Sequence, residues 1–558
     1  MRSDLALLGA VAVVLTWPLA ARIGVAVPGM PTSDTYDHLW GYWWYAHALA
    51  HGELPIRTTV SHWPPGGPLW FVDPAGAIVS LPFQALVGSA GGGYAITVLF
   101  KVWGGLAAGY LAAWQLTRER APALLGAVVF GGSAYVLSLL YSGTTEFLEL
   151  APLPLAWMAI RRALAKGGRG PVLLAAAAWT WATLGNFYHA AFVGLLLGIA
   201  VLSERAGGRA MLGRALAVVA AWAVFAAPIV AIAAWSLLGE GGAVTSGSAP
   251  GWNYQVLPAV DLLSFVHPGD YYFPDNAAFG NDGIQNTGYL GLLALLVALV
   301  GAWRDRALRL PLALTGLVAL GPTLAFHQQL VLVDGHTVPL PAALLYFPGS
   351  PFRLVHHPFR LVVLPMLFMG LAAARATSGR PRLALALAAG VLAETLWVSP
   401  GTFPIPTADA TAPALTTALR DDPAVHGVFD FPPDHRALNR RYEALATVHG
   451  KRIPYGVNVY LPDALRGNGF VRAMMGCLKR PARTSIPREG GPPVEPWRIS
   501  PSEADVATGR AALLAAELDV VVLHLTNLAP KEASCARTLL GGEAMYGDTE
   551  AEAWRVAR

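Results

Sequence analysis

Two carboxylates open the stretch SDTYDHLWGYWW at residues 33–44. Asp34 and Asp37 lie three residues apart, directly before a dense run of Trp and Tyr. On a helix this spacing places both on one face, and the aromatic run is typical of a helix at a membrane interface. A carboxylate shielded from water has a raised pKa and can act as a general base. We therefore predict Asp34 and Asp37 as catalytic bases and the adjacent His38 as a substrate-binding residue, with ordinary solvated loop carboxylates as the alternative.

A second group of candidates lies in SPFRLVHHPFRLVV, where two arginines flank a pair of histidines. Arginine is the side chain best suited to bidentate recognition of phosphate. Arg353 and Arg360 are therefore predicted to bind a phosphate group, and His356 and His357 either join that site or cap a helix. Binding of lipid head groups, or snorkelling at a helix end, would explain the arginines equally well.

Further polar residues occur in short connections between apolar segments. Acidic side chains at membrane depth are costly and usually face a polar cavity. The remaining substrate-binding candidates are Glu146, Glu149, Asn186, His189, Asp270 and Tyr271. The last two belong to an acidic and aromatic loop that suits a sugar, because aromatic faces stack on sugar rings and carboxylates accept hydroxyl hydrogen bonds. A solvated acidic loop is the alternative there.

Composition sets the class of protein. The chain of 558 residues is 54% hydrophobic and 13% charged, with a mean hydropathy of +0.47, whereas soluble proteins carry about 25% charged residues. This indicates a polytopic membrane protein. The net charge of +4 is too small and too dispersed for a nucleic-acid interface. No HExxH, Walker or strand-associated GxGxxG motif is present, so zincin, ATPase and dinucleotide-binding functions have no support.

The apolar segments predict an α-helical fold with about eleven transmembrane helices, since each segment approaches the length that crosses roughly 30 Å of hydrocarbon. They lie near residues 4–23, 94–116, 122–141, 147–161, 171–185, 187–203, 211–237, 286–303, 308–327, 359–377 and 382–399. The stretch 77–90 is too short to span and is expected at the interface or as a re-entrant segment.

Basic residues indicate the orientation of these segments. Five clusters fall on alternate connections, which the positive-inside rule assigns to the cytoplasm: Arg118/Arg120, Arg161/Arg162/Lys166/Arg169, Arg205/Arg209/Arg214, Arg304/Arg306/Arg309 and Arg375/Arg380/Arg382. The N-terminus is then cytoplasmic, while the first loop (24–93), the loops 238–285 and 328–358, and the C-terminal region face the periplasm or its equivalent. Arginine greatly outnumbers lysine, which favours a GC-rich bacterial genome and therefore a bacterial cytoplasmic membrane.

A change in composition near residue 400 divides the chain into a transmembrane domain (1–400) and a small extracytoplasmic α/β domain (401–558). In the second, HGVFDF and LDVVVLHL read as buried strands and TGRAALLAAEL as a helix. Cys477 and Cys535 both lie in this region, without the CxxC spacing of a zinc site. They can form a disulfide if the region lies outside the cytosol, and the sequence leaves that open.

Several motifs in order resemble the GT-C superfamily of integral membrane glycosyltransferases, in its uncharacterised bacterial branch. They are DTYDHLWGYWWYAHALAHGELP, HWPPGGPLWF, SLPFQALVG, SGTTEFLELAPLPLAWMAI, VHPGDYYFPDN, NTGYLGLLAL, FRLVHHPFRLVVLP and VFDFPPDHRALNRRYEALATVHGKRIPYGV. The resemblance covers nearly the whole chain. It implies a sugar donor carried on a polyprenyl phosphate or pyrophosphate, and an acidic residue of the first external loop, here Asp34 or Asp37, as base or metal ligand.

The expected function is therefore transfer of a sugar from a polyprenyl-linked donor to a lipid, glycan or protein acceptor at the outer leaflet of the bilayer. Mg²⁺ or Mn²⁺ suits carboxylate ligands, yet many GT-C enzymes need no metal, so a metal cofactor stays open. A transporter or flippase of lipid-linked glycans is the alternative from another class, although its polar residues would gather at the bilayer midplane. A non-catalytic GT-C-like scaffold is the third.

Overall fold

The computed structural model describes residues 2–31, 33–69, 73–204, 208–238, 260–268, 288–327, 329–347, 350, 352, 355, 357–399, 403–433, 436–456, 463–478 and 501–557. The chain forms two compact units. The first comprises Met1–Thr35, Val72–Val230 and Trp252–Asp409, and the second comprises Tyr36–Phe71, Ala231–Gly251 and Ala410–Arg558. About half of the first external loop expected from the sequence, residues 36–71, thus belongs to the same unit as the C-terminal region.

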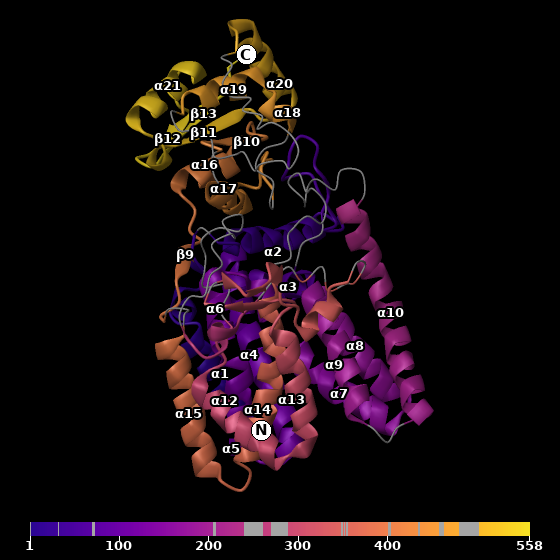
Figure 1. Cartoon of the computed structure of the whole chain (residues 1–558). Coiled ribbons are helices and arrows are strands. Elements are labelled where there is room, and N and C mark those ends of the chain that lie inside the picture. The colour runs from indigo at the N-terminus through magenta and orange to yellow at the C-terminus, as the bar shows by residue number, and fades with distance from the viewer. Residues whose placement is uncertain are drawn as a thin grey trace. The chain divides into compact units, whose positions relative to one another are not determined.

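The first unit is built almost entirely from apolar helices. Its helices are α1 (Arg2–Leu15), α3 (Pro74–Val87), α4 (Ala90–Thr117), α5 (Arg120–Gly131), α6 (Ala134–Ser142), α7 (Pro152–Lys166), α8 (Arg169–Gly185), α9 (Phe187–Ser203), α12 (Leu292–Arg304), α13 (Arg306–Ala319), α14 (Val363–Ala376), α15 (Pro381–Val398) and the part of α10 (Gly208–Leu238) that precedes Ala231. Within it α14 packs against α4, α5, α12 and α13 (Figure 1). Helix α14 is buried on nearly all sides and forms the centre of this bundle.

Close contact within the bundle depends on small residues. A Cβ built on Gly126 of α5 would lie 2.9 Å from the carbonyl oxygen of Gly370 in α14, and one built on Gly370 would lie 2.7 Å from that of Gly126. Real Cβ atoms do not approach so closely, so the two backbones meet only because both positions are glycine. Such small-residue contacts are typical of helices that pack in a membrane.

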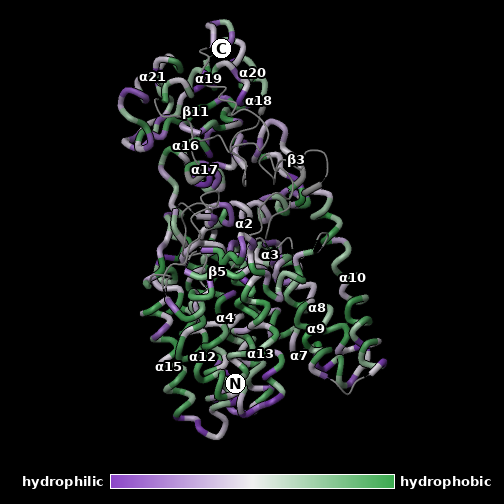
Figure 2. The backbone as a smooth tube through the Cα atoms, in the orientation of Figure 1, coloured by the Kyte–Doolittle hydropathy of each residue, from purple (hydrophilic) through white to green (hydrophobic). Residues whose placement is uncertain are grey.

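Four helices in the described part of the chain are long and apolar enough to cross a membrane, and a fifth span results if the bent pair α5 and α6 counts as one. Hydrophobic residues dominate these helices (Figure 2). The predicted segments around 147–203 and 286–327 form helices of 13 to 17 residues. At 1.5 Å per residue these cover roughly 20–25 Å, less than the roughly 30 Å hydrocarbon core. The count of eleven spans therefore stays a prediction.

A short strand pair fixes the segment that leads to Asp34. β1 (Ala26–Pro28) pairs antiparallel with β9 (Thr407–Asp409), and the amide of Gly29 donates to the carbonyl of Pro406. This pairing joins the segment after α1 to the segment after α15. Smaller ladders within the described part of this unit are β4–β5–β6 (Val260–Asp261, Leu324–Phe326, Gln329–Leu330) and β7–β8 (Leu332–Val333, His336–Thr337).

The second unit contains a four-stranded sheet in the order β10-β11-β13-β12. β10 (Val428–Phe431) and β11 (Val520–His524) are parallel, and β13 (Ala551–Arg555) is antiparallel to both β11 and β12 (Tyr546–Gly547). The two strands expected from HGVFDF and LDVVVLHL are confirmed, as is a helix at TGRAALLAAEL, which is α20 (Glu503–Ala515). The other helices are α2 (Thr35–Ala50), α16 (Ala414–Asp421), α17 (Arg436–His449), α18 (Asp463–Arg466), α19 (Gly469–Gly476) and α21 (Pro530–Leu540).

Two features hold the separate segments of this unit together. The amides of His62 and Trp63 donate to the carbonyls of Tyr455 and Ile453, so the loop from the N-terminal part of the chain pairs with the C-terminal region. A disulfide joins Cys477, directly after α19, to Cys535 of α21. The disulfide that the sequence left open is therefore present.

Candidate functional site

The structure distributes the predicted site residues over both units. The first unit contains seven of them: Asp34, Glu146, Glu149, Asn186, His189, His357 and Arg360. The second unit contains Asp37 and His38. Asp270, Tyr271, Arg353 and His356 lie outside the described residues. The two candidate bases are thus assigned to different units, although only two residues separate them.

Arg360 lies in a pocket of aromatic rings. It belongs to the 3₁₀ helix Pro358–Val362, which leads directly into α14, and its side chain is 6% exposed. Its guanidinium carbon lies 3.5 Å from the ring centroid of Phe147, 5.4 Å from that of Tyr188 and 5.8 Å from that of Phe359. Aromatic faces attract a desolvated cation, with about 2 kcal/mol for a good contact. No hydrogen bond or ion pair joins this side chain to another described residue, so its charge is available to an anionic ligand.

Two further polar side chains near Arg360 are buried and lack partners. His189, near the start of α9, is fully buried with its ring centroid 6.0 Å from that of Phe147. Both of its ring nitrogens lack a hydrogen-bond partner among the described residues. The second side chain is the fully buried Tyr135, whose hydroxyl also has no such partner there. Arg360 and Glu146 are charged neighbours of both side chains. Buried polar atoms normally have partners, so this grouping is suited to hold a polar ligand.

An ion-pair cluster that the sequence did not reveal lies in the same unit. Lys101 Nζ of α4 is 2.5 Å from Asp73 Oδ2 and 3.7 Å from Glu149 Oε2, with all three side chains at most 6% exposed. Asp73 also caps α3 through the amide of Gly76. Glu149 lies between helices, outside the candidate spans. Burial raises its pKa to about 7, opposed by the positive charge of Lys101.

Asp34 is positioned by its two neighbours in the chain. A Cβ built on Gly143 would lie 2.7 Å from Ser33 Oγ and 2.9 Å from Thr35 Cβ, so the segment 33–35 packs directly on this glycine. Tyr94 hydrogen-bonds with Thr145, which begins the 3₁₀ helix Thr145–Leu148 that carries Glu146. The structure therefore brings the segment that bears Asp34 against the turn that leads to Glu146.

Asp37 has a different environment in the second unit. It lies in the first turn of α2, and its Oδ2 is 3.0 Å from Arg440 Nε of α17, with both side chains less than 9% exposed. The neighbouring Arg441 places its guanidinium 5.3 Å from the ring centroid of Tyr36. His38 is buried in the same helix. Asp37 thus joins α2 to α17 of the C-terminal region.

Two other predicted residues have local contacts. Asn186 caps α9, because its side-chain oxygen accepts from the amide of Tyr188 at 2.7 Å. The ring centroid of His357 lies 5.7 Å from that of Phe359.

The sequence did not point to Asp73, Lys101 or Tyr135 as site residues. A lysine within the long apolar helix α4 was the available signal for Lys101, since a charge at membrane depth usually marks a function or a partner.

Within the described ranges, no three His, Cys, Asp or Glu side chains are arranged to hold a metal ion.

Comparison with known proteins gives similarity at the level of structure alone. No protein-family model matches the chain, and no curated protein matches it either. Among solved structures, the chain is similar to the oligosaccharyltransferase AglB from Archaeoglobus fulgidus in complex with an inhibitory peptide and a dolichol-phosphate. The identity is 12% and the TM-score 0.43, over 94% of this chain and 69% of that chain.

Two further structures show the same level of similarity. The arabinofuranosyltransferase AftD from Mycobacteria is 13% identical with a TM-score of 0.47, over 100% of this chain and 42% of that chain. ArnT from Cupriavidus metallidurans, bound to undecaprenyl phosphate, is 11% identical with a TM-score of 0.38. The similarity covers 99% of this chain and 98% of that chain. All three TM-scores are below 0.5, and all three identities are 13% or lower. At these values the similarity assigns no activity, substrate or site residue to this chain.

Proposed function

We propose that the chain is a membrane glycosyltransferase of the GT-C type, which transfers a sugar from a polyprenyl-phosphate-linked donor to an acceptor hydroxyl at the outer leaflet. The observation that carries this proposal is the buried guanidinium of Arg360. It has no carboxylate partner among the described residues and is surrounded by Phe147, Tyr188 and Phe359. A buried cation without a counter-charge is costly, and a phosphate ester would neutralise it.

The reaction needs one base and one site for the leaving group. Asp34 takes the proton of the acceptor hydroxyl, whose oxygen attacks the anomeric carbon of the donor sugar. The bond between that carbon and the phosphate oxygen breaks, and Arg360 stabilises the negative charge on the departing polyprenyl phosphate. We choose Asp34 over Asp37 as the base because Asp34 belongs to the same unit as Arg360, whereas Asp37 belongs to the other unit. His189 would donate a hydrogen bond to the sugar or its phosphate, and Glu146 would accept one from a sugar hydroxyl.

Transfer by the full-length protein in lipid nanodiscs tests this proposal. The donor is a radiolabelled sugar on undecaprenyl phosphate, and the product is label in the glycan or lipid acceptor fraction. The kcat of the Asp34→Asn variant should be at least about 100-fold lower, since general acid–base catalysis typically accelerates a reaction by roughly 10²- to 10⁴-fold. Asp334→Asn, at an exposed β-turn of the same unit, is the matched control and should keep its rate.

Binding separates the donor site from catalysis. Undecaprenyl phosphate should bind the wild type and Asp34→Asn equally, and should bind Arg360→Met at least tenfold more weakly, whereas the exposed Arg306→Met should bind normally. Retained binding without transfer in the wild type would favour the non-catalytic scaffold. Transfer of label across the bilayer without a new glycosidic bond would favour the flippase. Equal binding by Arg360→Met would contradict the phosphate site.

A further inference from the structure

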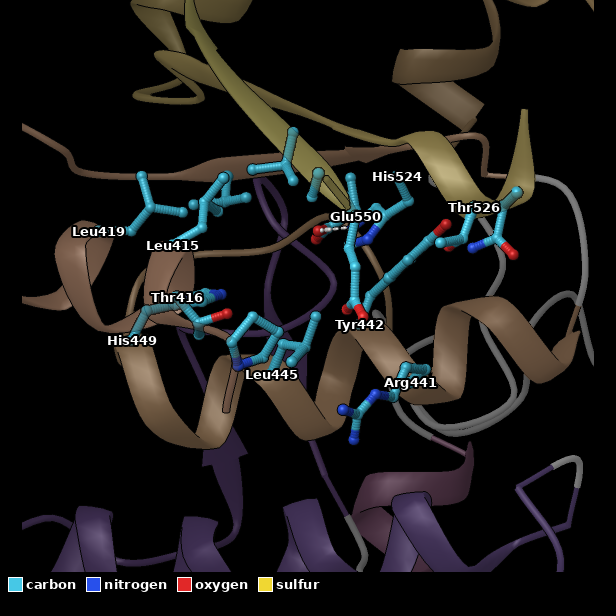
Figure 3. A pocket seen from close by; sticks show the side chains of 16 residues that line it. Leu415, Thr416, Leu419, Arg441, Tyr442, Leu445, His449, His524, Thr526 and Glu550 are labelled. Carbon is cyan, nitrogen blue, oxygen red and sulfur yellow. Dashed lines mark hydrogen bonds and ion pairs between the residues drawn. The ribbon is translucent and has the colours of Figure 1, made fainter. Parts of the chain in front are cut away.

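A pocket of about 130 Å³ lies within the second unit. One face of the parallel strands β10 and β11 lines it through Val428, Asp430, Val522 and His524, and α16 and α17 provide other lining residues (Figure 3). Asp430 and His524 lie close to the carboxyl ends of their strands, the edge at which open α/β sheets bind ligands. The pocket is far smaller than the roughly 300–1,000 Å³ of a drug-sized ligand site, so it suits one small group.

The lining includes a buried carboxylate with an unused acceptor. Asp430 is 2% exposed, and its Oδ1 lies 2.7 Å from His524 Nε2. Its Oδ2 has no hydrogen-bond partner among the described residues. A buried carboxylate oxygen without a partner costs more than an ordinary lost hydrogen bond. A ligand that donates a hydrogen bond to Oδ2 would therefore gain binding energy there.

A buried histidine offers a donor to the same pocket. His449 is 4% exposed, and its Nδ1 accepts from the amide of Lys451 at 2.9 Å. Burial lowers its pKa to about 4, although the negative charge of Asp430 opposes this shift. The ring is therefore neutral at pH 7 with its proton on Nε2. Asp430 and His449 together present an acceptor and a donor.

The charges of the pocket restrict the ligand. An anion would meet the buried carboxylate of Asp430 and the carboxylate of the exposed residue Glu550 on the lining. Arg441 does not offset them freely, because it donates to the carbonyl of Thr411 and contacts the Tyr36 ring. A purely apolar group would leave Asp430 Oδ2 unpaired. The lining combines the apolar Leu415, Leu419 and Leu445 with the hydroxyl of Thr416 and the amide of Asn527 (Figure 3). This mixture favours a neutral ligand with hydroxyl groups and an apolar ring.

We propose that this pocket binds one neutral sugar residue, with a sugar hydroxyl donating to Asp430 Oδ2 and another accepting from His449 Nε2. The pocket itself sets this ligand class. The identity of the glycan that carries this sugar is a separate question. That it is the acceptor glycan, and not another cell-surface glycan, rests on the proposed function. The pocket lies in the second unit, whereas Asp34 and Arg360 lie in the first, so it is a candidate sugar site of its own.

Saturation-transfer NMR with the full-length protein in nanodiscs tests binding without requiring any transfer activity. The probes are D-mannose, D-galactose, D-arabinose and N-acetylglucosamine at millimolar concentrations. At least one should give a signal with the wild type. Asp430→Asn should weaken its binding about tenfold or more, since hydrogen bonds to charged groups are the strongest. Thr526→Trp should also abolish binding, because this exposed lining residue would then fill the pocket without altering the core.

The control is Thr538→Trp at an exposed position of α21, which should bind as the wild type does. Circular dichroism confirms that each variant is folded. Absence of binding by all four probes, or equal binding by the wild type and Thr526→Trp, would overturn the proposal. In the transfer assay, a raised KM for the acceptor with unchanged kcat in Thr526→Trp would assign the sugar to the acceptor. An unchanged KM with lost sugar binding would assign it to a different glycan.

Discussion

Lys101 Nζ lies 2.5 Å from Asp73 Oδ2 in an ion pair whose side chains are 2% and 0% exposed. The lysine is part of α4, and the aspartate caps α3. Charges so deeply buried are stable only as a pair, because either one alone keeps its full cost of desolvation. The pair therefore fixes the start of α3 against α4.

Removing one member of this pair should be strongly destabilising. Lys101→Met leaves the carboxylates of Asp73 and Glu149 without their shared cation, so we expect a loss of about 3–5 kcal/mol in the free energy of unfolding. Denaturant unfolding in detergent micelles measures it. The exposed Lys531→Met should change stability by less than about 0.5 kcal/mol. A Lys101→Met protein as stable as the control would show that the pair is not formed in the folded state.

The ion pair between Asp37 and Arg440 should couple two distant parts of the sequence. A double-mutant cycle with Asp37→Asn and Arg440→Gln is expected to give a coupling energy of about 1–3 kcal/mol, since both partners are buried. The exposed pair of Arg420 and Asp421 is the control and should give at most about 1 kcal/mol. A coupling no larger than that of the control would contradict a stable contact between α2 and α17.

Much of the second unit could be predicted from local pattern. Short apolar runs bounded by polar residues predicted β10 and β11, and they form strands with fully buried residues at Val428 and Val520. Such signals depend on neighbours in the sequence. The pairing of Asp37 with Arg440 depends on contact across more than 400 positions of the chain. A single sequence carries no local trace of such a pair.

Part of the candidate site was equally accessible from the sequence. Acidic and basic residues in otherwise apolar surroundings indicated Glu146, Glu149, His189 and Arg360, which lie near one another in the first unit. The packing of Phe147 and Phe359 around Arg360 was not predicted, because both look like ordinary apolar positions. The span count was harder to predict, since Gly132 and Ser133 interrupt one apolar run and yield the bent pair α5 and α6.

Glu149 should make stability depend on pH. Its pKa of about 7 lies above its ordinary value of 4.5 because the side chain is buried. The folded state therefore binds a proton that the unfolded state has already lost. This contribution to stability is complete below pH 4.5 and disappears as the pH rises through about 7.

Comparison with Glu149→Gln isolates this effect. Between pH 4.5 and 7.5, the free energy of unfolding of the wild type should fall by roughly 3 kcal/mol relative to the variant, at 1.36 kcal/mol per pKa unit. Denaturant unfolding at several pH values measures the difference. Glu53→Gln, at an exposed position, should show no such relative change. Parallel pH profiles of the wild type and Glu149→Gln would contradict a raised pKa.

The disulfide between Cys477 and Cys535 should stabilise the second unit. It closes a chain segment with a sequence separation of 58 residues, and loops of this length lose enough unfolded-state entropy to add roughly 2–4 kcal/mol. The double variant Cys477→Ser/Cys535→Ser should therefore unfold at a lower denaturant concentration by that amount. Dithiothreitol should lower the wild type to the value of the variant and leave the variant unchanged. A reductant effect of equal size on both would show that the loss does not come from this bond.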